Sequence, residues 1–403
     1  MSKGADDNYP ASGAVRHIYV HIPFCARICP YCAFYKTRPD RSQTDRFCEA
    51  ILAELRASNA SLDGTGKTGR SGGIDARPSG RDASTPSRFQ PETLFFGGGT
   101  PTALTTAQIE KLLAGFAAEL DLSHLREWTF EANPGSVSER KARLLRQGGV
   151  NRISLGVQSF DDSLLRLLGR DHSAAHAEAT FQLLRQAGFE SVNVDLMFGL
   201  PGQTLGQWEN SLRRALALAP DHISTYCLTY EEDTEFLQRH KQGELRSDPE
   251  ADADFFALAD ELLGGAGFEH YEVSNYARPG FQSIHNQAYW GGKDYLGIGP
   301  SAVSTLGFRR WTNVADYRLY ADRILQGEPV STRHEILTPQ MKRAEAIALS
   351  LRTDRGVPAA WIEEQADEIK EFVRLGLMKP ADQRYVLTRA GRFLADSVAE
   401  AFV

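Results

Sequence analysis

The 403-residue chain lacks the features of a membrane-spanning or disulfide-stabilised protein. No apolar run is long enough to span a bilayer, and residues 1–14 are polar, without the apolar core of a signal peptide. There are only five cysteines, and the clustering of three of them does not resemble a disulfide framework. We therefore expect a cytoplasmic protein in a reducing compartment.

The chain also lacks an excess of positive charge. It has 45 Lys and Arg against 52 Asp and Glu, and a formal net charge of −7. This balance argues against a general nucleic-acid binder and against a protein that coats anionic membranes. The hydrophobic content of 42% is that of an ordinary globular protein, so we expect a soluble chain with one large domain and an appendage, or two domains.

Three of the cysteines form a CxxxCxxC motif, Cys25, Cys29 and Cys32, directly after an expected strand at 17–21. Three thiolates so close in sequence can hold three irons of a four-iron cluster, which leaves one iron open to chelate an amine and a carboxylate. The alternatives are a zinc knuckle and a loop of free thiols. Zinc needs four ligands, and no fourth cysteine follows, although His21 is close.

Strand and helix patterns alternate between residues 17 and 230, which predicts an α/β fold with a parallel sheet. We expect strands at 17–21, 93–96, 127–131, 152–155, 191–197 and 222–228, and helices at 44–58, 106–120, 138–147, 174–187 and 205–218. Residues 1–16 are predicted to be a flexible arm. Residues 59–90, rich in Gly, Ser, Pro, Asp and Arg, are predicted to be a disordered insertion.

Polar and glycine residues gather where these strands are expected to end, which is where α/β barrels place their functional groups. Gly97 to Thr100 follow one strand, and glycine lets a backbone approach a ligand closely. Glu131, Gln158 and Asp195 end other strands, and Arg170 lies in a following loop. Each has a plain alternative: a tight turn for the glycines, a surface ion pair for Arg170, and a strand-end cap for Asp195.

The CxxxCxxC motif, followed by the Gly-Gly-Gly-Thr-Pro segment after one strand, resembles the radical S-adenosylmethionine (SAM) proteins. The resemblance implies an open (β/α)6 partial TIM barrel, a [4Fe–4S] cluster on the three cysteines, and SAM on the open iron. It also implies the cofactor-binding residues, which are Tyr19, Tyr31, Phe34, Gly98, Gly99, Thr100, Glu131, Gln158, Arg170 and Asp195.

Within that superfamily the chain is most similar to the oxygen-independent coproporphyrinogen III dehydrogenase family. The segments that carry the resemblance are YVHIPF (19–24), GGGTPT (97–102), GVQSF (156–160) and DLMFGLPG (195–202). The true dehydrogenases have a fourth cysteine two places after the third, where this chain has Phe34. They also have a longer N-terminal arm. We therefore do not expect a true dehydrogenase, although this enzyme remains the alternative function.

The other branch of that family, the HemW-type heme chaperones, carries an HNxxYW motif. This chain has it as His285 to Trp290, and a neutral imidazole is a good iron ligand. The resemblance implies heme as a ligand, His285 on the heme iron, and an unidentified acceptor protein, for which a respiratory protein is one candidate. Alternatively, His285 and Trp290 are packing residues at a domain junction. Peripheral membrane contact and the choice between monomer and homodimer stay open.

Two further regions follow the expected barrel. Residues 231–312 contain the HNxxYW motif and are expected to extend the core and cover the barrel mouth. Residues 313–403 are expected to form a helical, winged-helix-like domain. Its segment 368–403 has six Lys or Arg and five Asp or Glu, so no basic stripe predicts DNA binding. Cys227 is interpreted either as a second soft ligand or as a buried thiol, and the latter is favoured.

Overall fold

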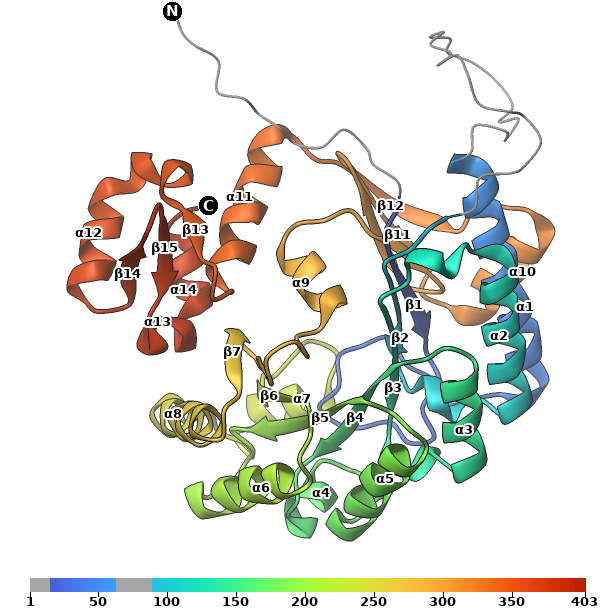
Figure 1. The fold of residues 1–403 in the computed structure, drawn as a ribbon, viewed down its shortest axis with the longest axis horizontal. Helices are drawn as coiled ribbons and strands as arrows, with labels where there is room; N and C mark the ends of the chain where they lie inside the picture. The colour runs from blue at the N-terminus through green and yellow to red at the C-terminus, as the bar shows by residue number, and fades with distance from the viewer. Residues whose placement is uncertain (1–14, 63–88) are drawn as a thin grey trace, which may run out of the picture.

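The structure is a computed structural model that describes residues 15–62 and 89–403 (Figure 1). Most of the expected arm 1–16 and insertion 59–90 lies outside these ranges. Residues 59–62, however, belong to helix α1 (Arg41–Leu62), which is longer at both ends than predicted. Asn59 explains part of this extension, because its side chain donates to Glu119 O and accepts from Phe89 N. Across both described ranges, no helix combines the length and apolarity needed to cross a bilayer.

Six parallel strands form the centre of the molecule and pair in chain order, β6-β5-β4-β3-β2-β1, with helices between them. This confirms the predicted open (β/α)6 partial barrel. The strands are β1 (His17–Ile22), β2 (Thr93–Gly98), β3 (Glu127–Ala132), β4 (Arg152–Gln158), β5 (Ser191–Phe198) and β6 (His222–Cys227). After α1, the helices between them are α2 (Thr106–Glu119), α3 (Glu139–Gln147), α4 (Asp162–Leu167), α5 (Ala174–Gln186) and α6 (Leu205–Ala217).

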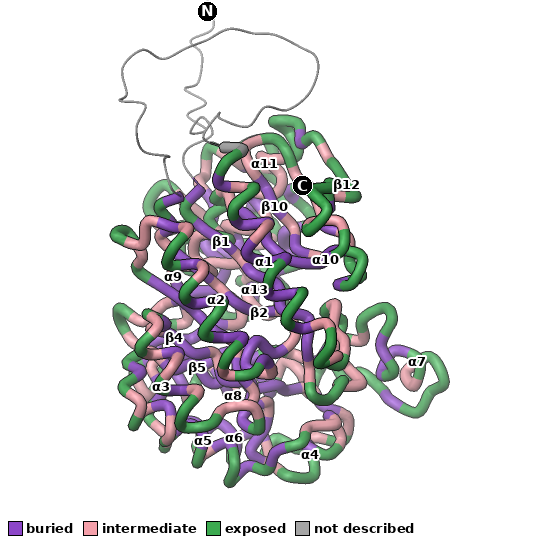
Figure 2. The backbone as a smooth tube through the Cα atoms, turned by 90° about the vertical axis from the view of Figure 1, so that its right-hand side faces the viewer, coloured by how far each residue is buried: buried purple, intermediate pink, exposed green. Residues whose placement is uncertain are grey.

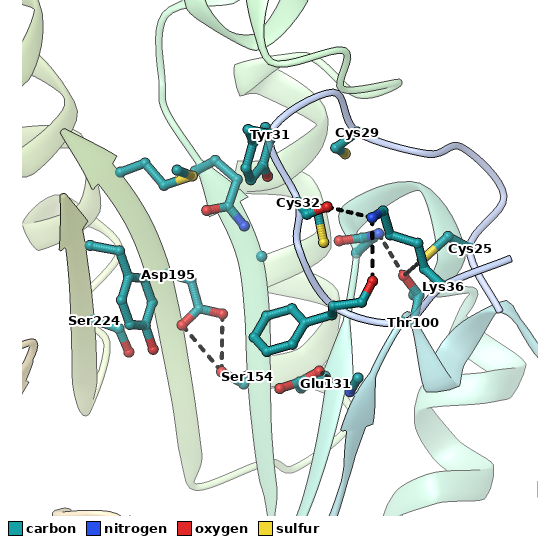
Figure 3. A pocket seen from close by; sticks show the side chains of 18 of the residues that line it. Cys25, Cys29, Tyr31, Cys32, Lys36, Thr100, Glu131, Ser154, Asp195 and Ser224 are labelled. Atoms are coloured by element: carbon teal, nitrogen blue, oxygen red, sulfur yellow. Dashed lines mark hydrogen bonds between the residues drawn. The ribbon is translucent and has the colours of Figure 1, made fainter. Parts of the chain in front are cut away.

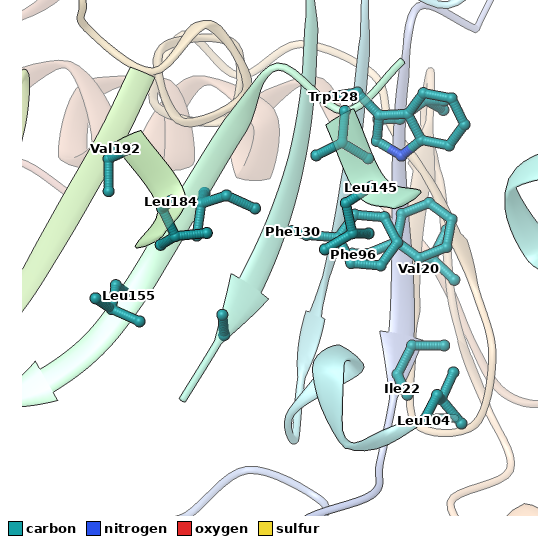
Figure 4. Packing of buried hydrophobic residues seen from close by; sticks show 14 of the residues in the cluster. Val20, Ile22, Phe96, Leu104, Trp128, Phe130, Leu145, Leu155, Leu184 and Val192 are labelled. Atoms are coloured by element: carbon teal, nitrogen blue, oxygen red, sulfur yellow. The ribbon is translucent and has the colours of Figure 1, made fainter. Parts of the chain in front are cut away.

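The main core lies between the outer face of this sheet and the surrounding helices. Side chains alternate between the two faces of a strand, so in β2 Phe96 points toward the helices while Phe95 points into the partial barrel. Phe96 stacks on Phe130 of β3 with ring centroids 4.5 Å apart and contacts Phe116 of α2 edge-on (Figure 4). In Figure 2 the buried residues follow the strands, and exposed residues lie on the outer turns of the helices.

Residues 231–312 do not cover the barrel mouth with strands, contrary to our expectation. Their short strands widen the sheet at both edges: β8 (Asn275–Ala277) pairs with β6 and with β7 (Glu269–Glu272), and β9 (Leu296–Ile298) pairs in parallel with β1. Helices α7 (Glu235–Lys241) and α8 (Pro249–Gly265) precede them. Helix α9 (Ile284–Trp290), which carries the HNxxYW motif, packs against β2 on the inner side of the sheet (Figure 1).

Residues 313–338, which we expected to open the C-terminal domain, pack instead with the main core. Helix α10 (Tyr317–Gln326) lies along α1, and its Tyr320 is fully buried there. A second sheet holds β10 (Val303–Leu306), β11 (Arg309–Asn313) and β12 (Ser331–Ile336) in antiparallel order. The chain therefore leaves the main core only after β12.

A separate small core begins at α11 (Pro339–Leu351) and contains Leu351, Val357 and Phe402. Around it lie β13 (Val357–Pro358), α12 (Ala366–Arg374), β14 (Met378–Ala381), β15 (Arg384–Leu387), α13 (Arg389–Phe393) and α14 (Ala395–Glu400). The last helix of our prediction is thus divided in two. This unit meets the sheet edge after β7, where Val273 N donates to Arg352 O at 3.0 Å.

One buried carboxylate links α1 to the elements that close the sheet. Glu54 is 8% exposed and accepts hydrogen bonds from Gly299 N (2.8 Å), Asn313 Nδ2 (2.7 Å) and Tyr320 OH (2.6 Å). Burial outweighs these bonds and raises the pKa of Glu54 from 4.5 to about 7. The folded state therefore binds a proton at Glu54 more tightly than the unfolded state does.

We expect this group to make the protein less stable as pH rises. Between pH 4.5 and 7 the folded state retains the Glu54 proton that the unfolded state has lost, so raising pH through this window costs up to about 3 kcal/mol. Urea unfolding of the wild type and of Glu54→Gln at pH 5 and pH 8 measures the effect. The Gln variant should lose less stability over this interval, and equal losses in the two proteins would contradict the prediction.

Candidate functional site

The three cysteines lie on one loop that follows β1 and is closed at its base by the backbone. Cys25 N donates to Thr37 O at 2.9 Å, and Thr37 N donates to Pro23 O at 2.8 Å. Cys25, Cys29 and Cys32 are free thiols, all partly exposed, and all three line the same cavity (Figure 3). A short, closed loop thus presents three sulfur atoms to one space.

Polar side chains surround these sulfur atoms. Thr100 Oγ1 lies 3.6 Å from Cys25 Sγ, and Arg170 Nη1 donates to Cys29 Sγ at 3.6 Å. Lys36 Nζ donates to the carbonyl oxygens of Cys32 and Phe34. Burial raises the pKa of the Cys25 thiol to about 11 and also raises the pKa of Cys32, so a metal that binds here must displace protons.

The donor set suits an iron–sulfur cluster better than a zinc ion. Both ring nitrogens of His21, the fourth zinc ligand that the sequence suggested, are already engaged: Nε2 with Tyr35 O at 2.9 Å and Nδ1 with Tyr19 OH at 3.1 Å. In the part of the chain that the structure describes, no three His, Cys, Asp or Glu side chains are grouped closely enough to hold one metal ion. Three thiols with no fourth ligand match a cluster that leaves one iron open.

The glycine turn after β2 is required by packing as well as by the cavity. Gly98 has a φ of +101°, and a Cβ there would lie 2.4 Å from the imidazole of His21. A Cβ on Gly99 would lie 2.7 Å from the backbone of Pro23. Both glycines also line the cavity, so the tight-turn interpretation and the ligand interpretation hold together.

Two half-buried carboxylates face the cavity from β3 and β5. Glu131 accepts from Gly98 N at 3.0 Å, and burial together with nearby Asp195 raises the pKa of Glu131 to about 8. Asp195 lies within β5 rather than at its end, and it accepts from Ser154 Oγ (3.0 Å) and Asn193 Nδ2 (2.7 Å). Burial raises its pKa too. A cationic ligand would stabilise both carboxylates in their ionised form.

Arg170 is a cavity residue rather than half of a surface ion pair. Its Nη2 donates to Gly156 O at 2.6 Å and to Asn133 Oδ1. Asn133 Nδ2 in turn donates to Thr100 Oγ1 at 2.9 Å. The Nε of Arg170 is buried with no partner among the described residues. Arg170 therefore joins the ends of β3 and β4 to the cysteine loop.

The cavity has a volume of about 610 Å³ and collects most of the residues singled out in the sequence. Besides the three cysteines, its walls include Tyr31, Phe34, Gly98, Gly99, Thr100, Glu131, Gln158, Arg170 and Asp195. Tyr19 and His285 instead pack against Phe95, which does line it, with ring centroids 6.1 and 5.1 Å away. Cys227 also lines the cavity, and burial raises the pKa of its thiol to about 12.

Sequence reasoning missed several polar wall residues. These are Lys36, Asn133, Arg152, Ser154, Asn193, Ser224, Tyr226 and Asn286. Some had a signal in the sequence: Ser154 is two positions after Arg152, and Asn193 two before Asp195, as expected for side chains on one face of a strand. Asn286 had none beyond the HNxxYW motif, because only the tertiary fold brings α9 to the sheet.

Comparisons with known proteins agree with this geometry. The Radical SAM superfamily model matches residues 86–215. The chain is 33% identical to the heme chaperone HemW of Lactococcus lactis subsp. lactis (strain IL1403) over 96% of both chains. It is 34% identical to HemW of Bacillus subtilis (strain 168), over 96% of this chain and 99% of the relative.

A third curated relative and a solved structure extend the comparison. HemW of Escherichia coli (strain K12) is 37% identical over 72% of this chain and 70% of the relative. The structure of coproporphyrinogen III oxidase (HemN) from Escherichia coli, a radical SAM enzyme, superposes with a TM-score of 0.79. It covers 98% of this chain and 91% of that chain at 24% identity, which supports the fold. Because two HemW relatives match along almost the whole chain, the protein belongs to the HemW family of the radical SAM superfamily.

Proposed function

We propose that the protein is a heme chaperone, which binds heme and transfers it to an acceptor protein while carrying a SAM-coordinated [4Fe–4S] cluster. The observation that carries the proposal is similarity along almost the whole chain to proteins named heme chaperone HemW. The acceptor we expect is a heme-dependent protein, for example a respiratory one. Nothing in this proposal requires the porphyrin to be chemically altered.

His285 has the chemistry required of a heme-iron ligand. Burial lowers its pKa to about 3, so the imidazole is neutral at physiological pH and has a free electron pair for a metal. Its Nδ1 lies 2.8 Å from Thr93 Oγ1, and that hydroxyl also lies 3.0 Å from His17 Nδ1. This contact engages Nδ1 and orients the ring, which leaves Nε2 as the iron-binding nitrogen we propose.

The turn that presents His285 is held by one carboxylate. Glu127, at the start of β3, accepts from Ile284 N (2.7 Å), His285 N (3.1 Å) and Ser283 Oγ (3.0 Å). Negative charge at a helix N-terminus is favourable, so Glu127 stabilises the first turn of α9. The proposed heme ligand is therefore fixed at both its backbone and its ring.

The proposed roles of the cavity residues follow from their charges. When bound, the cluster supplies an open iron and an electron for SAM chemistry. Cys25, Cys29 and Cys32 would hold three of its irons. Glu131 and Asp195, half-buried without an ion pair among the described residues, suit the positive groups of SAM, and Arg170 suits its carboxylate.

The second candidate function is oxygen-independent coproporphyrinogen III dehydrogenation. This second function is favoured by the cavity and the cysteine loop, which would also serve that reaction. Phe34, however, occupies the position of the fourth cysteine of the true dehydrogenases, and it is 67% exposed. No packing constraint demands phenylalanine there, since an exposed position accepts most side chains. The residue is therefore consistent with a chain that does not need that fourth thiol.

Two measurements on the same anaerobically reconstituted protein test the proposal. In a heme titration followed by Soret absorption, we expect saturable binding of one heme per chain. Incubated with coproporphyrinogen III, SAM and a reductant, the protein should form no vinyl porphyrin. Unsaturable heme uptake would contradict the chaperone function, and vinyl-porphyrin formation would establish the second candidate.

A further inference from the structure

Arg152 is a buried cation that forms no ion pair with any carboxylate of the described residues. It is the first residue of β4, it is 4% exposed, and it lines the cavity. Its Nη1 donates to Ser191 Oγ at 3.2 Å, while its Nε has no hydrogen-bond partner. Arg185 and Arg214, farther from the cavity, are by contrast each paired with a carboxylate at 2.7 Å.

A guanidinium stays charged at any physiological pH, and an unpaired charge in a protein interior is strongly unfavourable. The acidic groups of the cavity do not relieve Arg152 by direct contact. Asp195 is hydrogen-bonded to Ser154 and Asn193, and Glu131 to Gly98 N. Arg152 therefore keeps a buried Nε–H without a partner and has no ion pair, although its charge lowers the pKa of nearby Asp195. A bound anion would supply the missing partner of the guanidinium.

Arg152 lies far from the cysteine loop. It begins β4, whereas Gln158 ends the strand six residues later, a distance of roughly 20 Å along an extended strand. Strand register places Phe95, Thr129 and Arg152 in one row across β2, β3 and β4, and Asn286 of α9 lines the same cavity. Phe95, Arg152 and Asn286 line the cavity, and we call these three residues the cavity floor. The floor offers an aromatic ring and, two strands away, a cation.

We propose that Arg152 binds a carboxylate of the molecule that occupies the cavity. Arginine matches a carboxylate with two parallel N–H···O bonds, and Phe95 offers an apolar surface for the rest of that molecule. The source we infer is a propionate of heme, which rests on the proposed function. The carboxylate of SAM, which the proposed function assigns to Arg170, is the alternative that the experiment distinguishes. The heme source gains support from His285, which packs on Phe95 and sits on the same helix as Asn286.

A heme without free carboxylates distinguishes the two possible sources of the carboxylate that Arg152 binds. Anaerobically reconstituted wild type and Arg152→Gln are titrated with heme and with heme dimethyl ester, whose propionates are neutral, and SAM binding is measured by equilibrium dialysis. Arg213→Gln, which removes an exposed arginine paired with Glu209 on α6, is the control and should match the wild type.

If the carboxylate is a propionate, Arg152→Gln weakens heme binding about tenfold or more and leaves ester binding unchanged. If it belongs to SAM, the SAM affinity falls by that factor and heme binding is unchanged. The proposal would be overturned if Arg152→Gln left the affinities for heme and SAM unchanged. It would also be overturned if the substitution weakened the binding of heme and of its ester equally while SAM binding stayed the same. Should the wild type bind no heme, the proposed function fails, and the SAM measurement still decides the role of Arg152.

A structural role for Arg152 predicts a different result. Arg152→Met removes the charge but keeps much of the volume, so we expect the ligand-free variant to unfold at the same temperature as the wild type or higher. Adding heme or SAM should raise the unfolding temperature of Arg152→Met by less than it raises that of the wild type. A lower unfolding temperature without ligand, together with unchanged affinities for heme and SAM, would show that the guanidinium only supports the fold.

Discussion

Replacing Cys25, Cys29 and Cys32 together with alanine should reduce the iron bound after anaerobic reconstitution from about four atoms per chain to near zero. All three thiols line one cavity. Loss of the thiolates removes every sulfur ligand from the cysteine loop, and the neighbouring Thr100 hydroxyl, Arg170 and Lys36 are poor ligands for iron. Iron and acid-labile sulfide analysis, with the visible absorption of the cluster, measures the result.

Cys227→Ala is the matched control for that experiment, because Cys227 is a partly buried thiol in the same cavity. It ends β6 rather than lying on the cysteine loop, so we expect iron content to be unchanged. The triple variant should keep the fold, since the three cysteines lie on a partly exposed loop outside the main core. Iron retained in the triple variant, or lost equally from Cys227→Ala, would contradict the assignment.

His285→Ala should weaken heme binding by about tenfold or more and shift the Soret band of whatever heme still binds. The substitution removes the neutral imidazole proposed to bind the iron. It also leaves a space on Phe95 next to Thr93, which added imidazole should enter and so restore the wild-type spectrum. A titration with and without imidazole measures both effects.

The packing interpretation of His285 predicts something else. A purely structural histidine would lower the unfolding temperature and leave the heme spectrum unchanged, and imidazole would have no effect on binding. Thr93→Val serves as a second control, since it removes the hydroxyl that contacts His285 Nδ1 but keeps the imidazole. We expect it to weaken heme binding less than His285→Ala does. If His285→Ala binds heme with unchanged affinity and spectrum, the proposed ligand is wrong.

Local patterns in the sequence predicted the parts of the molecule that local physics controls. The alternation of strand and helix patterns between residues 17 and 230 and the spacing of the cysteines require no knowledge of distant residues. The same holds for Gly98, where a positive φ excludes other side chains. These signals predicted the partial barrel and part of the cavity wall. Neighbouring parallel strands end at the same edge, so residues at strand ends had to meet.

Tertiary structure alone decided the rest, because long-range hydrogen bonds and packing have no local signature. Strands β8 and β9 have three residues each, too few for a periodic signal, and their edge positions depend on backbone pairing with β6 and β1. Helix α10 joined the main core because Tyr320 meets the carboxylate of Glu54, 266 residues earlier. Arg152 looked like an ordinary strand residue. Only the curved sheet, which turns Arg152 into the cavity, made it a buried cation without an ion pair to any described carboxylate.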